Sequence, residues 1–191
     1  MSADAIARVT AVLQNRLAAA IGGPVYVGSP IAEDVGTRTL SLCLFHVVPN
    51  QSLRNERHYV ARPGDPDGPL VEAQTLPLDL RYLLSVFRSS GAGGLADPDE
   101  LVTLGQAVQA LHEQPVIDDA QVPGQLVRIT PESYPVDELH RIWGLFPESS
   151  YRTSVVYLLS PVAVALDPPP AGPAVLQLSS RQGPFTERVP S

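Results

Sequence analysis

A glycine-rich motif in the middle of the chain has the form of a cofactor-binding loop. Residues Gly91–Ala96 read G-x-G-x-x-A and lie between a predicted strand and a predicted helix, as in dinucleotide-binding loops. The helix start signals come later, at Asp97-Pro98, which is too late for a phosphate to meet the helix end. Asp99 and Glu100 in the first turn would also repel a pyrophosphate. We therefore interpret the motif as a connecting loop and predict no cofactor.

Histidines are the next residues that could do chemistry, as metal ligands. His112-Glu113 begins an H-E-x-x-H motif, but Val116 stands where the second histidine is needed. A helix C-terminus favours partial positive charge, so we expect a structural role for His112. His46 interrupts a strand face and is expected to be a buried imidazole, whereas His140 is expected on an exposed helix side. We predict no metal site.

The sequence also contains no pattern typical of nucleophilic catalysis. Ser154 and Ser160 lie on a predicted strand, and the sequence contains no G-x-S-x-G elbow. All 13 basic residues are arginine, so a lysine Schiff base and a lysine-containing phosphate loop are excluded. We predict no catalytic residue, and a small-molecule-binding enzyme stays open as the less favoured alternative.

A basic cluster, Arg54-Asn55-Glu56-Arg57-His58, lies in a polar loop. Most charged stretches only keep a protein surface hydrated, and that is the default interpretation of this cluster. The alternative is a contact arm, because the planar guanidinium group of arginine binds carboxylates at two points. The net charge is −7 and the pI is about 5.0. This acidic balance argues against a nucleic-acid partner.

The overall composition indicates one globular unit. A chain of 191 residues can bury a real core, and its 20 prolines predict short, sharply bounded elements. Cys43 is the single cysteine, so no internal disulfide can form. The sequence shows no signal-peptide pattern and no apolar run of about 18 residues. We predict no membrane partner and expect cytoplasmic synthesis and assembly.

The strand predicted at Leu76–Phe87 is the best-specified element. Alternate residues from Leu76 to Val86 are apolar and predict a face against the core. The opposite face begins with Pro77, Asp79 and Arg81 and then turns apolar. A second layer or a neighbouring subunit is therefore expected to cover only part of that face.

The other predicted elements complete an α/β (α+β) fold. It consists of a mixed sheet of about four to five strands flanked by three helices, in a domain spanning residues 1–166. A Pro-rich tail follows at residues 167–191. The polar stretch at 50–70 cannot hold a regular element at 62–69, and its length makes it a candidate binding arm. The remaining helices are expected at 2–20, from 98 to about 114, and at 135–146, and the remaining strands at 25–27, 38–48, 126–130 and 151–164.

Several segments, in order over roughly residues 4–165, resemble a known family. They are similar to the cap, or tail-terminator, proteins of extracellular contractile injection systems. These systems are phage-tail-like particles of the antifeeding-prophage and virulence-cassette type. The matching segments are Asn50 with 53–55, LPLDLRYLL at 76–84, 104–105 with 111–112 and 115–116, 127–129, 138–139 with 142–143, and YRTSVVY at 151–157 followed by 161–162.

The resemblance implies a non-enzymatic particle component with an α/β sandwich fold. Such a cap closes the tube and the contractile sheath at the end away from the baseplate, usually as a six-fold ring. The implied partners are further copies in a hexameric ring and the tube and sheath subunits, in a particle that is released or stays intracellular. A baseplate or cargo-loading adaptor is the alternative. The candidate interface residues are Arg54, Asn55, Arg57 and Arg81, with Tyr151 and Arg152 as weaker ones.

Tube and sheath contacts do not close on themselves, so growth stops where a subunit offers one complementary face and no second one. Extended segments dock by adding a strand to an open sheet edge. The arm at 50–70 and the Pro-rich tail are the two segments that we expect to be free to do this.

Overall fold

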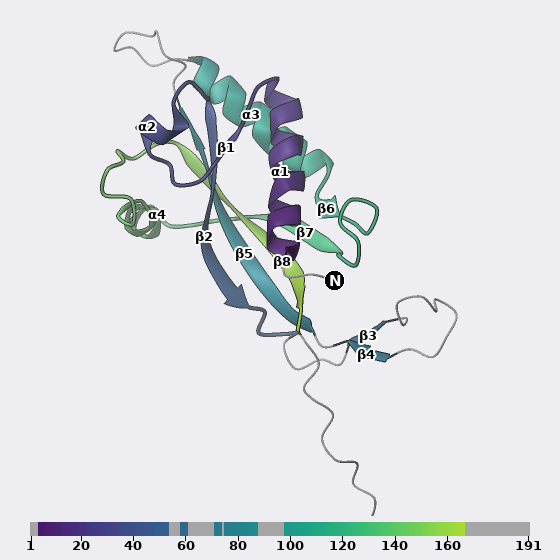
Figure 1. Cartoon of the computed structure of the whole chain (residues 1–191). Coiled ribbons are helices and arrows are strands. Elements are labelled where there is room, and N and C mark those ends of the chain that lie inside the picture. The colour runs from purple at the N-terminus through teal and green to yellow at the C-terminus, as the bar shows by residue number, and fades with distance from the viewer. Residues whose placement is uncertain (1–3, 54–57, 61–70, 74, 88–97, 167–191) are drawn as a thin grey trace, which may run out of the picture.

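A six-stranded mixed sheet forms the centre of the protein (Figure 1). The computed structural model describes residues 4–53, 58–60, 71–73, 75–87 and 98–166. The strand order is β1-β2-β5-β8-β7-β6, with β1 parallel to β2 and every other pair antiparallel. The strands are β1 (Tyr26–Val27), β2 (Leu40–Pro49), β5 (Thr75–Val86), β6 (Val116–Ile117), β7 (Val127–Glu132) and β8 (Ser154–Ala165).

Helices cover the two faces of this sheet unequally. The long helices α1 (Ala5–Ile21) and α3 (Pro98–Glu113) lie side by side on one face, whereas the short α4 (Val136–Trp143) lies on the other. The fold class predicted from the sequence is confirmed. The sheet has one strand more than expected, because β6 has only two residues, and a four-residue helix α2 (Ala32–Val35) follows β1.

The main core lies between α1, α3 and the sheet. Val9, Leu13 and Leu17 on α1 are fully buried, as their helical spacing predicts. They pack in one apolar cluster with β5 and β8 residues. Within this cluster the Oη of Tyr82 and the Oγ1 of Thr10 are 2.6 Å apart and share a hydrogen bond. The helix and the central strand are thus joined by both apolar packing and a polar contact.

The helical spacing of Leu101, Leu104, Val108 and Leu111 predicts the core side of α3, and the structure agrees with this only in part. Leu111 is buried, but Leu101 in the first turn is 62% exposed, and Ala107 takes a buried position that the prediction missed. Leu104 is partly buried against the main core, so the helix packs on the core from this residue onward.

The stretch predicted as an irregular arm contains a small hairpin. Strands β3 (His58–Val60) and β4 (Val71–Ala73) pair antiparallel, with Tyr59 opposite Glu72. They form a separate two-stranded sheet that stands off the end of β2 and β5 (Figure 1). The prediction of no regular element at 62–69 falls on residues outside those that the structure describes.

Candidate interaction surface

The sheet face opposite α1 and α3 is covered over only part of its length. Ile142 and Trp143 of α4 pack on Leu83 and Val156, which pair on adjacent strands. Farther along β5 toward its start, Arg81 and Asp79 follow on the same face and are half-buried. The predicted change of character along this face is therefore confirmed. We call the uncovered polar part around Asp79 and Arg81 the open half-face.

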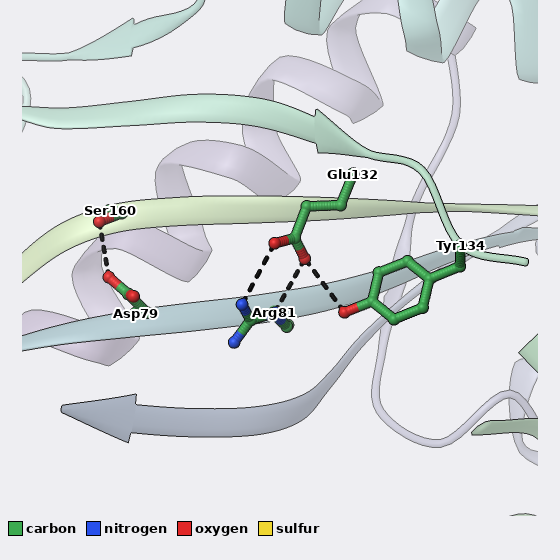
Figure 2. A network of polar contacts seen from close by, with 5 residues as sticks. All are labelled: Asp79, Arg81, Glu132, Tyr134 and Ser160. Atoms are coloured by element: carbon green, nitrogen blue, oxygen red, sulfur yellow. Dashed lines mark hydrogen bonds and ion pairs between the residues drawn. The ribbon is translucent and has the colours of Figure 1, made fainter. Parts of the chain in front are cut away.

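Arg81 forms a two-pronged ion pair across the open half-face (Figure 2). Its Nε donates to Glu132 Oε2 at 2.8 Å and an Nη donates to Glu132 Oε1 at 3.2 Å. Tyr134 Oη also donates to Glu132 Oε2, at 3.2 Å. The hydrogen bond to Glu132 raises the pKa of Arg81 above its ordinary value. Arg81, predicted to dock a partner, thus ties β5 to β7 across the intervening β8.

A second polar cluster lies at the end of the sheet from which the hairpin leaves. Asp79 Oδ1 accepts hydrogen bonds from Ser160 Oγ at 2.6 Å and from Asn50 Nδ2 at 2.8 Å. The Asn50 side-chain oxygen accepts from the backbone N–H groups of Ser52 and Leu53, at 3.0 and 2.9 Å. We call Asn50, Asp79 and Ser160 the Asn50 clamp. It holds β2, β5 and β8 together and sets the direction in which the chain leaves β2.

Sequence reasoning placed Asn50 in a family-like segment but missed this role. A polar residue that follows a strand and Pro49 is a turn signal, so the Asx turn could have been predicted. Its partners Asp79 and Ser160 lie 29 and 110 residues along the chain. Pairing over such separations depends on the sheet register and leaves no local pattern.

Tyr151 and Arg152 lie away from the open half-face. They precede Ser154, which pairs with Ser85 at the far end of β5. The Tyr151 side chain is 62% exposed, and its ring lies 5.8 Å from that of Trp143. The Arg152 guanidinium lies 4.5 Å from the ring centre of Phe87, a cation–π distance. Tyr151 is free to contact a partner, whereas Arg152 is engaged within the chain.

The remaining predicted site residues are not all described. Arg54, Asn55 and Arg57 lie outside the described residues, as does the glycine-rich motif at 91–96. In the described ranges, no three His, Cys, Asp or Glu side chains are grouped to hold a metal ion. Burial raises the pKa of the Cys43 thiol to about 11, so this thiol is unreactive at neutral pH. His46, expected to be a buried imidazole, is exposed.

A shallow groove of about 490 Å³ runs between α1 and α3. Arg16 in its wall donates to the backbone oxygens of Gln114 and Val116 and to Gln121 Oε1. These carbonyls follow the C-terminus of α3, where the positive charge of arginine is favourable. Arg16 is therefore a structural tie between the two helices. Among the described helices, none is long and apolar enough to cross a membrane.

Comparison with known proteins gives one family, and the similar solved structures include two terminator proteins. The family described as the Pvc16 N-terminal domain matches residues 8–177. The fold is similar to the sheath/tube terminator, in its extended state, of PVC, an extracellular contractile injection system. There the TM-score is 0.59 and the identity 17%, over 93% of this chain and 65% of that one. It is also similar to the tube-terminating cap of the anti-feeding prophage, with TM-score 0.54 and 19% identity, over 91% of this chain and 60% of that one.

This chain thus spans less than two thirds of the length of either terminator. None of the curated proteins matches it. The family match covers most of the residues that form the sheet and its helices. The chain belongs to the Pvc16 N-terminal domain family.

Proposed function

We propose that this protein is a structural cap that terminates the inner tube and the contractile sheath of a phage-tail-like injection particle. It acts at the end away from the baseplate, assembled as a ring of identical copies. The observation that carries the proposal is the family match over residues 8–177, together with the fold shared with two proteins named as terminators.

The surface of the described residues is compatible with an assembling protein. Arg81 and Glu132 neutralise each other's charge in the open half-face, and the Asp79 carboxylate accepts hydrogen bonds from Asn50 and Ser160. A neighbour can cover a surface of this kind while its polar groups keep their hydrogen bonds. We propose that the protein acts without catalysis and that its partners are its own copies and the tube and sheath subunits.

The arginine-containing arm stays part of this proposal. Arg54, Asn55 and Arg57 flank the start of the β3–β4 hairpin in sequence and are proposed to contact the tube or sheath. Arg81 is proposed to reach a partner only through the outer surface of its ion pair. The Pro-rich tail at 167–191 is proposed as an appendage separate from the domain at 1–166.

The proposal is tested in cells that produce the particles. Deleting the gene is expected to give tubes and sheaths of uncontrolled length, and complementation is expected to restore a single length. A gold-labelled tag on this chain should mark the end opposite the baseplate in electron micrographs. Particles of normal length in the deletion strain would contradict the proposal, and so would label at the baseplate.

A further inference from the structure

Within the described residues, the outer edge of β2 has a neighbouring strand over only part of its length. The partner strand β1 pairs only with Ser41 and Leu42. The chain turns away at Gly28, whose φ of +154° suits glycine, and a Cβ there would lie 2.7 Å from the Tyr26 hydroxyl oxygen. From residue 43 to residue 49, no other strand of the described chain lies beside this edge.

The hydrogen bonds of β2 show which backbone groups face outward. The C=O of Leu42 accepts from Gly28 N–H, away from β5, whereas Asn50 N–H donates to Pro77 C=O on β5. Backbone groups alternate along a strand, and the register shift between Leu44 and His46 marks a bulge at Phe45. Val47 therefore turns both its N–H and its C=O outward, and its side chain is 42% exposed.

The bulge also corrects the predicted faces of this strand. Strict alternation along the strand predicts Val47 on the same face as Cys43 and Phe45. It is paired with Leu80, on the face that carries the main core. One extra residue in β2 moves every later side chain to the opposite face.

In the described chain, the opposite edge of the sheet is less open to an added strand. Ile129 N–H of β7 donates to the C=O of Pro115. By alternation the next outward residue is Pro131, which has no N–H to offer. Farther along this edge, the side-chain amide of Gln125 binds the backbone of Ala163 on β8. Its oxygen accepts from the Ala163 N–H at 2.9 Å, and its nitrogen donates to the Ala163 C=O at 2.8 Å. This amide takes the place of a neighbouring strand.

The open stretch of β2 accepts only a short strand. It is bounded by the bulge at Phe45 and by Pro49, which cannot donate, so its regular part is three residues centred on Val47. The strands β3 and β4 have three residues each, and within the described chain each pairs only with the other. The hairpin lies off the end of β2 and β5 and does not pair with β2 of its own copy (Figure 1).

We propose that the β3–β4 hairpin of one copy adds a strand to the open edge of β2, at 46–48, in the next copy. The donor and the acceptor are different surfaces of the same chain, so the contact is heterologous and generates a ring when the rotation closes. This inference rests on the proposed function, because it supplies the contact between neighbouring copies of the cap.

Backbone pairing is tested by a matched pair of substitutions in the particle-producing strain. Val47→Pro removes the outward N–H, which donates to no other strand of the described chain, whereas Val47→Thr keeps it. We expect V47P to lower incorporation into particles and ring formation by the purified chain at least tenfold. We expect V47T to behave as wild type. Equal assembly of the two variants would overturn the proposal.

Cross-linking keeps the proposal testable if V47P fails to fold. In a Cys43→Ala background, chains carrying Val47→Cys are co-expressed with chains carrying Tyr59→Cys or Glu72→Cys. We expect a disulfide-linked dimer in assembled particles for at least one of the two combinations. Leu126→Cys, on the other side of the sheet and 71% exposed, is the control and should give none with either hairpin cysteine.

The outcomes separate the two proposals. Particles that contain the chain at their capped end but give no V47C cross-link above the L126C control would overturn the hairpin contact and leave the cap function standing. Absence of the chain from the particle ends would overturn the cap function, and the hairpin contact with it.

Discussion

The two faces of the central sheet differ in composition and in role. The face under α1 and α3 is filled by large apolar side chains, with Leu13, Leu80 and Leu159 fully buried. The open half-face carries polar groups that bind one another across three strands, such as Arg81 with Glu132. The first face stabilises the fold through burial, and the second leaves a surface that a neighbour can cover.

The comparison shows that strand β5 serves both faces through its alternation. Leu80 and Tyr82 point into the main core, while Asp79 and Arg81 point to the open half-face. Substitutions at alternate positions should therefore separate folding from assembly.

Removing a core side chain should have the largest effect on stability. Leu159 is fully buried opposite Leu80, so Leu159→Ala is expected to lower the free energy of unfolding by about 2–5 kcal/mol. Urea unfolding of the purified chain measures this. Leu126→Ala, at a site 71% exposed, is the control and should change it by less than about 0.5 kcal/mol. Similar losses for both variants would contradict the described packing.

Alkaline pH should destabilise the folded chain through Tyr157, which lies in the main core. Burial raises the pKa of this phenol from its ordinary 10.0 to about 12. Tyr157 ionises at lower pH in the unfolded chain than in the folded one. Its contribution to the free energy of unfolding is therefore complete below pH 10 and is lost as pH rises through 12. The loss from this group is about 2–3 kcal/mol.

The measurement is urea unfolding at pH 9 and pH 11.5 for wild type and Tyr157→Phe. The variant should lose less stability between the two pH values. At pH 7 it should be at least as stable as wild type, because the Tyr157 hydroxyl is buried and has no hydrogen-bond partner in the described chain. An identical alkaline loss in both proteins would refute the prediction.

Breaking the Asn50 clamp should have an intermediate effect. Asn50→Ala removes hydrogen bonds to Asp79, Ser160 and two backbone N–H groups, while Asp79 and Ser160 keep theirs. We expect a loss of about 1–2 kcal/mol in unfolding free energy and faster proteolytic cleavage between residues 51 and 74. The exposed Asn15 on α1 supplies the control, Asn15→Ala, which should show neither change.

The ion pair of the open half-face should contribute least. Arg81 and Glu132 side chains are each 21% exposed and bound at two points. A double-mutant cycle with alanine is expected to give a coupling energy of about 1 kcal/mol. The pair of Arg8 and Asp4 on α1, with side chains 53% and 44% exposed, should give less than about 0.5 kcal/mol. Equal couplings would remove the distinction between the two surfaces.

Much of the fold could be predicted from hydrophobic spacing. The alternation along β5 predicted both its buried side and the change of character on its other side, because burial imposes a period of two. The spacing of Val9, Leu13 and Leu17 predicts the buried side of α1 for the same reason, with a helical period. The short β6 and α2 were missed, because two to four residues carry no periodic pattern. The equally short β1 was predicted only from the apolar run at 25–27.

The interaction surface was less predictable, because it depends on register. Arg81 was correctly placed on the second face, but its partner Glu132 lies 51 residues away and meets it only through the β5–β8–β7 pairing. The bulge at Phe45 has no compositional signal, yet it turns the backbone of Val47 outward. That β2 has a free edge in the described chain therefore follows from the three-dimensional pairing alone.

Amide hydrogen exchange of the chain, free and assembled in particles, tests most directly the claim that copies of this chain assemble through the outer edge of β2. We predict that the amide of Val47 exchanges at least tenfold more slowly in the assembled protein. The buried amides of α1 around Leu13 should keep the same rate in both states. Unchanged exchange at Val47, with new protection confined to the outer surfaces of α1 and α3, would contradict the account.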